Sequence, residues 1–216
     1  MSWQEWFEHV WVAREEQVYR TSFGPDTGGI YVLDAKVFED FQKGGVDPRW
    51  LTHGVLKFPP TPTRGSWLFA TSGLSNPWED EQPNPDGWSG LGCELVIEAA
   101  GDFEWALVHL RRLLAFQILL ASGRYEGKKP LRVGDRIPLG NPIDCGQSLL
   151  TWCLVAPPTG YRSSFQLASG KVEFLHLVGI TEAEARFARE RGQEELLRRL
   201  APIGYPLTNT DRSSVV

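Results

Sequence analysis

The spacing of apolar residues predicts two long helices in this chain. Residues 3–19 place tryptophan, phenylalanine and valine side chains at helical intervals, with acids on the other faces. This pattern predicts an amphipathic helix that buries its tryptophans. Residues 104–121 carry a leucine-rich stripe that is wider than a surface helix needs. We therefore expect this second helix to lie across the face of a sheet.

Short apolar runs bounded by glycine and proline predict the strands of that sheet. These runs cover residues 29–33, 54–60, 67–71, 91–100, 149–158 and 171–180. The run 91–100 alternates, so that Cys93 and Leu95 fall on one side while Glu94 and Glu98 fall on the other. We expect the side with the two glutamates to be a solvent-exposed face of the sheet.

Capping residues mark two further helices. Asp34 precedes the apolar positions of residues 34–43, which are followed by two glycines. Thr181 and Glu184 have the spacing of a capping box, in which each side chain bonds to the backbone of the other residue. The helix that Thr181 opens is broken at Gly192, and its balanced charges are typical of a solvated face.

The stretch WLFATSGLSNPW, residues 67–78, changes from a buried strand into a loop of small polar residues and turn formers. The connection continues through residues 72–92 and carries unpaired acids at 79–86. A connection of this length is typical of a functional or mobile loop. We found no repeat and no strong linker, and the sequence predicts one α+β domain over residues 1–216.

Composition and charge narrow the function. The chain has 216 residues, is 42% hydrophobic and has a formal net charge of −5. An acidic balance argues against binding nucleic acid, because phosphates need a basic face, but it suits a basic protein partner.

The three cysteines have no paired spacing, which suits a reducing compartment. The start of the chain lacks a signal-peptide pattern, and the apolar run 113–121 is about half the ~20 residues of a membrane span. We expect a cytoplasmic protein that does not enter membranes.

The residue types that carry chemistry are scattered. No two histidines or cysteines have metal-ligand spacing, and neither a nucleophile elbow nor a phosphate-binding loop is present. The hydroxyls of Ser72 and Ser75 are typical of turns that bond to their own backbone. The acids of 79–86 do not have the spacing of a calcium loop, although oxygen ligands of this kind can bind a cation. The sequence therefore predicts no catalytic residue, no cofactor and no metal site.

Five segments occur in an order that resembles the Suppressor of fused (Sufu) domain family. They are a W-x-F-x-x-x-GLS segment, an SG-x-G-x-EL strand, a GD turn, an FL-x-x-VGIT segment and a terminal TD-R. In this chain they consist of Trp67, Phe69, Gly73, Leu74 and Ser75; Ser89, Gly90, Gly92, Glu94 and Leu95; Gly134 and Asp135; Phe174, Leu175, Val178, Gly179, Ile180 and Thr181; and Thr210, Asp211 and Arg212. Each segment alone is weak evidence for the family, but five segments in the same order are specific to it.

The resemblance implies an α+β fold with a mixed sheet covered by helices, and no known enzymatic activity. Animal members are two-lobed adaptors that sequester Gli transcription factors by gripping an extended peptide between the lobes. This chain ends four residues after Arg212, and the acidic residue that binds the peptide aligns near Ala156. Gli binding is therefore not carried over. The chain is closer to small bacterial-type members, some of which are proposed to be immunity proteins against a cognate toxin.

A partner-binding surface is predicted from these segments. Its candidate residues are Ser75, Trp78, Glu79, Asp80, Trp88, Glu94, Asp211 and Arg212. Trp78 and Trp88 are the expected anchors, since aromatic residues carry much of the binding energy of interfaces. In the alternative interpretation both tryptophans fold back over the sheet, and Glu94, Asp211 and Arg212 form an internal ion pair or cap that fixes the carboxyl end.

Three functions remain open at this point. The leading hypothesis is a non-enzymatic protein-binding domain, such as an immunity or sequestering protein for a basic bacterial toxin. The second is a hydrolase, which requires a deep pocket where Ser75, Glu94 or Asp211 converge with a base. The third is a structural or regulatory subunit, which a self-complementary apolar patch would indicate. For the first we expect a monomer or weak dimer.

Overall fold

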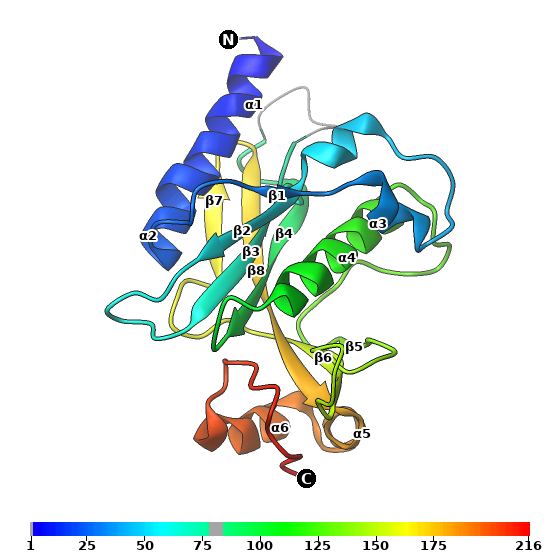
Figure 1. Ribbon diagram of the computed structural model, residues 1–216. Helices are drawn as coiled ribbons and strands as arrows, with labels where there is room; N and C mark the ends of the chain where they lie inside the picture. The colour runs from blue at the N-terminus through cyan, green and yellow to red at the C-terminus, as the bar shows by residue number, and fades with distance from the viewer. Residues whose placement is uncertain (1, 78–83) are drawn as a thin grey trace.

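A mixed eight-stranded sheet lies between two helical layers (Figure 1). The computed structural model describes residues 2–77 and 84–216. The strand order is β1-β2-β3-β4-β8-β6-β5, and β7 pairs with β8 beyond the end of β6. All pairings are antiparallel except β4 with β8, whose residues align parallel from Cys93–Glu173 to Ile97–Leu177. The strands are β1 (Tyr31–Val32), β2 (Gly54–Phe58), β3 (Trp67–Ser72), β4 (Trp88–Ala99), β5 (Arg136–Pro138), β6 (Leu150–Ala156), β7 (Ser164–Leu167) and β8 (Gly170–Thr181).

Helix α4 (Glu104–Ala121) covers one face of the sheet, as its wide apolar stripe predicts. It buries Leu110 and Leu114 against Phe69 of β3 and Leu95 of β4 in the largest apolar cluster of the molecule. Two short helices, α3 (Ala35–Glu39) and the 3-10 helix η2 (Pro48–Thr52), lie beside α4. The side chain of Asp34 caps α3 through Val37 N–H, as expected, but the helix ends at Glu39.

The N-terminal helix covers the opposite face. It runs without a break through α1 (Trp3–Val12), the π-helical segment η1 (Ala13–Tyr19) and α2 (Arg20–Phe23). Trp6 and Val10 are buried in a second cluster with Phe174 of β8. The expectation that this helix buries its tryptophans is wrong for Trp3 and Trp11, which are each 41% exposed, because the apolar stripe is wider than the contact with the sheet.

This covering also corrects the solvent-exposed face predicted for β4. Glu94 is fully buried and Glu98 is 9% exposed, while Val96 between them packs in the cluster under the N-terminal helix. Alternation along the strand is real, since Leu95 and Ile97 face α4. Both faces of a central strand are buried, however, and a sequence pattern cannot say that a distant helix covers the polar one.

The C-terminal part packs on the ends of β6 and β8. Helices α5 (Glu182–Arg191) and α6 (Gln193–Leu200) bury Ala188 and Leu196 in a third cluster, and the 3-10 turn η3 (Ala201–Ile203) follows. The capping box of Thr181 and Glu184 is confirmed, as is the break at Gly192, whose φ is +91°. In the described part of the chain, no helix has the length and apolarity needed to cross a membrane.

Candidate functional site

The hydroxyl-rich loop after β3 is folded around a buried carboxylate. One oxygen of Glu94 accepts hydrogen bonds from Gly73 N–H (3.1 Å), Ser75 N–H (3.0 Å) and the Ser75 hydroxyl (2.7 Å). Its other oxygen accepts the Thr71 hydroxyl at 2.6 Å. The small polar residues of this loop are therefore the donors that satisfy Glu94 of the neighbouring strand, because a buried carboxylate must be hydrogen-bonded.

Arg14 of η1 closes the same network from the other side. Its guanidinium is 1% exposed and donates to Ser72 (2.8 Å), Ser75 (3.1 Å) and Asn76 (2.6 Å), and one of its nitrogens lies 3.9 Å from the Glu94 carboxylate. The Ser75 hydroxyl thus bridges the two charges. We call Arg14, Ser72, Ser75, Asn76 and Glu94 the loop network. It holds the N-terminal helix, the loop and β4 in one arrangement.

Two glycines allow the loop to approach its neighbours. Gly73 has a φ of +139°, and a Cβ there would lie 2.3 Å from the ring of His53. Gly90 of β4 has a φ of +54°, and its Cβ would lie 2.4 Å from the carbonyl oxygen of Asn76. Both positions need a residue that tolerates positive φ and has no side chain. Leu91 N–H then bonds to the Leu74 carbonyl at 2.7 Å, which ties the loop to the start of β4.

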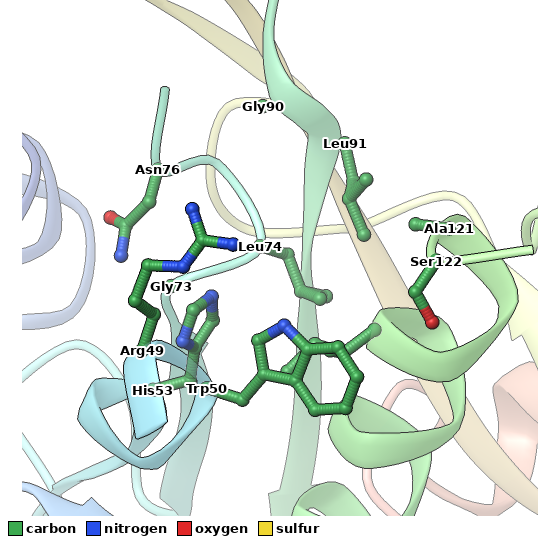
Figure 2. Close-up of a pocket in the computed structure, with 11 residues that line it drawn as sticks. Arg49, Trp50, His53, Gly73, Leu74, Asn76, Gly90, Leu91, Ala121 and Ser122 are labelled. Atoms are coloured by element: carbon green, nitrogen blue, oxygen red, sulfur yellow. The ribbon is translucent and has the colours of Figure 1, made fainter. Parts of the chain in front are cut away.

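A pocket of about 250 Å³ opens beside this loop (Figure 2). Leu74, Leu91 and the Trp50 ring point into the same space. Ile118 of α4 also lines the pocket. Arg49, His53 and Asn76 lie on one side, and Ala121 and Ser122 lie on the other. We call this space the loop pocket. Its walls are apolar and its edge is polar. One of the walls is the loop after β3, which the loop network holds in place.

His53 is the titratable group at the inner wall of the pocket. It is 3% exposed, and its burial, together with the nearby positive charge of Arg14, lowers its pKa to about 4. The imidazole is therefore neutral at pH 7, and its ring packs against Gly73. Within the part of the chain that the structure describes, no group of His, Cys, Asp and Glu is arranged to hold a metal ion.

The predicted partner-binding residues have different locations. Ser75 and Glu94 come together in the loop network, but both are fully buried. Trp88 is 53% exposed, and the Lys171 ammonium lies 4.9 Å from its ring. It does not fold back over the sheet. Trp78, Glu79 and Asp80 lie outside the described residues.

Arg212 belongs to a separate buried ion pair at the carboxyl end. Its guanidinium donates to both oxygens of Glu184 at 2.6 and 2.7 Å, and Glu184 also accepts Val215 N–H. Burial raises the pKa of Glu184, but the bonds from Arg212 and the backbone outweigh it and hold the pKa below its usual value. An internal ion pair therefore fixes this end of the chain. The carboxylate that pairs with Arg212 is Glu184, whereas the alternative interpretation expected Glu94. Asp211 is exposed.

The convergence that the hydrolase hypothesis requires is incomplete. Ser75 meets Glu94, which lies opposite Phe174 of β8, whereas Arg212, next to Asp211, bonds to the Gly179 carbonyl five residues further along that strand. Five strand residues correspond to roughly 16 Å. The two parts of the proposed catalytic set are thus at different levels of the sheet.

Sequence reasoning missed most of the site. In residues 3–19 Arg14 is a single basic residue within a tryptophan-rich apolar pattern, and an arginine in that setting is a signal of a buried partner. Asn76 lies in a stretch of turn formers, and His53 has no metal-ligand spacing to another residue. Neither pattern indicates a pocket. Trp50 and Leu91 gave no signal, because the walls of the loop pocket come from η2, the loop, β4 and α4, which are distant in sequence.

Comparisons with known proteins agree with the resemblance seen in the sequence. The family model described as "Suppressor of fused protein (SUFU)" matches residues 49–213. No curated protein matches the chain. Among solved structures, a chain of the Sufu–Fu complex superimposes with a TM-score of 0.67 at 20% identity, covering 98% of this chain and 91% of that one.

Two further solved structures share the fold. A protein described as a SUFU homolog from Neisseria gonorrhoeae FA 1090 has a TM-score of 0.65 at 18% identity, with 99% of this chain and 98% of that chain covered. Drosophila Suppressor of Fused has a TM-score of 0.59 at 22% identity, with 76% of this chain covered but only 42% of the Drosophila chain. At these identities the likeness establishes the fold, a mixed sheet with helices on both faces.

Proposed function

The chain belongs to the Suppressor of fused family, and on that premise we propose that it acts by binding another protein at the loop pocket. The observation that supports the proposal is the preformed shape of this pocket. At about 250 Å³ it is smaller than the 300–1,000 Å³ typical of small-molecule sites, and its size suits one bulky side chain of a partner. Interface anchors typically fill apolar pockets with a polar rim, as here.

The loop network makes the pocket suitable for this role. Arg14 and Glu94 fix the loop that forms one wall, so little conformational entropy is lost there when a partner binds. One solved relative was crystallised as the Sufu–Fu complex, which is a complex with another protein. We extend that mode of action, but not that partner, to this chain.

We propose further that the partner is a basic protein and that the chain is an immunity or sequestering protein of a bacterial toxin. The net charge of −5 favours encounter with a positively charged surface. The gonococcal homolog indicates that proteins of this fold occur in bacteria. The thiols of Cys93, Cys145 and Cys153 are free, which is compatible with action in the reducing cytoplasm.

The proposal is tested by blocking the pocket without removing any of its packing. Ala121 is exposed at the pocket edge, so Ala121→Trp places a large side chain there at little cost in stability. Val108→Trp is the control, since Val108 is an exposed residue of the same helix that does not line the pocket. Both variants are co-expressed with the product of the neighbouring gene, which the proposal identifies as the toxin, and the affinity of the purified pair is measured by calorimetry.

We expect Ala121→Trp to weaken binding at least about tenfold and to remove growth protection, because an interface anchor contributes about 2 kcal/mol or more. Val108→Trp is expected to behave like the wild type. Equal affinity of both variants would show that the partner does not use the loop pocket. Failure of the wild-type chain to protect against the neighbouring product would reject the toxin proposal.

A further inference from the structure

The side-chain amide of Asn76 is held in one orientation at the edge of the loop pocket. Asn76 is 6% exposed, and its carbonyl oxygen accepts a hydrogen bond from the Arg14 guanidinium at 2.6 Å. A guanidinium has donors but no acceptor, so only the oxygen of the amide can face it. The amide nitrogen, with its two N–H donors, is therefore turned away from Arg14.

These two donors are not used inside the protein. Among the residues that the structure describes, none accepts a hydrogen bond from the Asn76 nitrogen, and this nitrogen is not sealed in the interior. Asn76 lines the loop pocket, on the same side as Arg49 and His53 (Figure 2). A largely buried amide whose donors lack a partner at a pocket is suited to a ligand that brings a hydrogen-bond acceptor.

The local charges favour a neutral acceptor over a carboxylate. Arg49 donates to both oxygens of Asp47, with the shortest bond at 2.7 Å, so its charge is balanced by a neighbour. Arg14 likewise lies between the carboxylates of Glu94 and Glu15, at 3.9 and 3.5 Å. A carboxylate of a ligand would lose its hydration here without meeting an uncompensated cation. A carbonyl oxygen costs less to remove from water.

The acceptor closest to an inserted side chain is the main-chain carbonyl of the same residue. The walls formed by Leu74, Leu91 and Trp50 suit an apolar side chain, which has no acceptor of its own. In an α-helix the carbonyls already accept hydrogen bonds along the helix axis. In an extended segment or loop the carbonyl is available to another molecule. The pocket and the Asn76 amide together therefore suit an apolar residue of a non-helical segment.

We propose that the loop pocket recognises an apolar residue in an extended segment of the partner, and that Asn76 donates a hydrogen bond to the main-chain carbonyl of that residue. Arg14 is the positioning residue that sets the orientation of the amide. The inference rests on the proposed function, because it takes the loop pocket as the contact site. It adds the conformation of the partner segment and makes Asn76 a specificity-determining residue.

Recognition of the carbonyl is tested with two uncharged probes on the wild-type chain. N-acetyl-phenylalanine amide has an apolar side chain and main-chain carbonyls, whereas toluene has the aromatic ring alone. Each is titrated into the isotope-labelled full chain, and NMR follows the methyl groups of Leu74 and Leu91 and the side-chain N–H protons of Asn76. We expect both probes to shift the methyl signals, and only the amide probe to move the Asn76 protons downfield.

Three results of these titrations would overturn the inference. Methyl shifts with both probes but equal effects on the Asn76 protons would show that the amide does not read a carbonyl. An absence of methyl shifts with either probe would reject the pocket as a site for an apolar side chain. Tighter binding of N-acetyl-phenylalanine, which has a free carboxylate, than of the amide probe would assign the donors of Asn76 to a carboxylate.

The variant Asn76→Asp assigns the effect to the donor. Aspartate keeps the size of the side chain and an oxygen for Arg14, but it has no N–H group. We expect the amide probe to bind about tenfold more weakly and toluene to bind as before. Thr52→Asp is the control for the added charge, since Thr52 is exposed and does not line the pocket. Equal weakening in both variants would contradict the role of the donor, and the wild-type titration remains the test if Asn76→Asp does not fold.

The partner assay separates this inference from the proposed function. An added carboxylate attracts a basic partner, so charge alone predicts tighter binding to Asn76→Asp, whereas loss of the donor predicts about tenfold weaker binding. A partner that Ala121→Trp weakens and Asn76→Asp does not would retain the loop pocket as the contact site and reject the carbonyl contact. A partner whose affinity neither variant changes would reject the site itself.

Discussion

The loop network predicts a large and measurable coupling between Arg14 and Glu94. Arg14→Met removes the guanidinium and leaves an uncompensated buried carboxylate at Glu94, whereas Glu94→Gln leaves a buried guanidinium whose remaining ion pair is with Glu15, at 3.5 Å. Breaking a buried pair from one side typically costs 3–5 kcal/mol of unfolding free energy. Removing both charges avoids the unpaired state. The double variant should therefore lose less stability than the sum of the two single variants.

The magnitude follows from the geometry. Two unit charges 3.9 Å apart interact by about 4 kcal/mol at an effective dielectric constant of 20, before desolvation is subtracted. The Ser75 hydroxyl, which bonds to both groups, adds an indirect contribution. We expect each single variant to lose about 3–5 kcal/mol and the coupling free energy of the pair to be about 1–3 kcal/mol.

Denaturant unfolding followed by tryptophan fluorescence measures all four proteins of this cycle. In thermal unfolding, a single-variant loss of that size corresponds to a fall in Tm of roughly 6–20 °C for a chain of this length. Far-UV circular dichroism verifies that each variant is folded in the absence of denaturant. Additive losses, or single-variant losses below about 1 kcal/mol, would show that the two charges do not stabilise one another and would refute the reasoning.

Other predictions test the same architecture. Gly73→Ala should lose at least about 2 kcal/mol because of its positive φ and the His53 ring, whereas Gly45→Ala, which meets no atom within 4 Å, should stay within about 0.5 kcal/mol in thermal melts. Burial lowers the pKa of His176 to about 4, below the ~6.5 of an unfolded histidine. The neutral imidazole therefore stabilises the folded state fully above pH ~6.5, and this stabilisation is lost as the pH falls towards 4. An NMR titration in which His176 protonates near 6.5 would contradict this. Arg212→Leu should cost about 3–5 kcal/mol by leaving Glu184 unpaired, with Arg212→Lys intermediate; unchanged hydrogen exchange at the C-terminus in the leucine variant would argue against the ion pair.

Local patterns in the sequence were sufficient for most secondary structure. The helix over residues 104–121 is confirmed at both ends, and the six predicted strands are present with shifted ends. The strand Ser164–Leu167 was missed, because four residues beside a two-residue turn give little periodic signal. The family membership is also confirmed, since its motifs are short and lie in order along the chain.

The candidate site required the tertiary structure. Alternation along β4 correctly separated Glu94 from Leu95. The expectation that the Ser72 and Ser75 hydroxyls bond to their own backbone is wrong, because the Ser75 hydroxyl donates to Glu94 of β4 and the Ser72 hydroxyl donates to Glu15. That Arg14, 80 residues earlier in the chain, would cover this polar side could not be read from either segment alone. Local physics fixes which face of an element is polar, because side-chain direction repeats with a short period. Whether that face meets water or a buried opposite charge depends on long-range packing, which is a property of the whole fold.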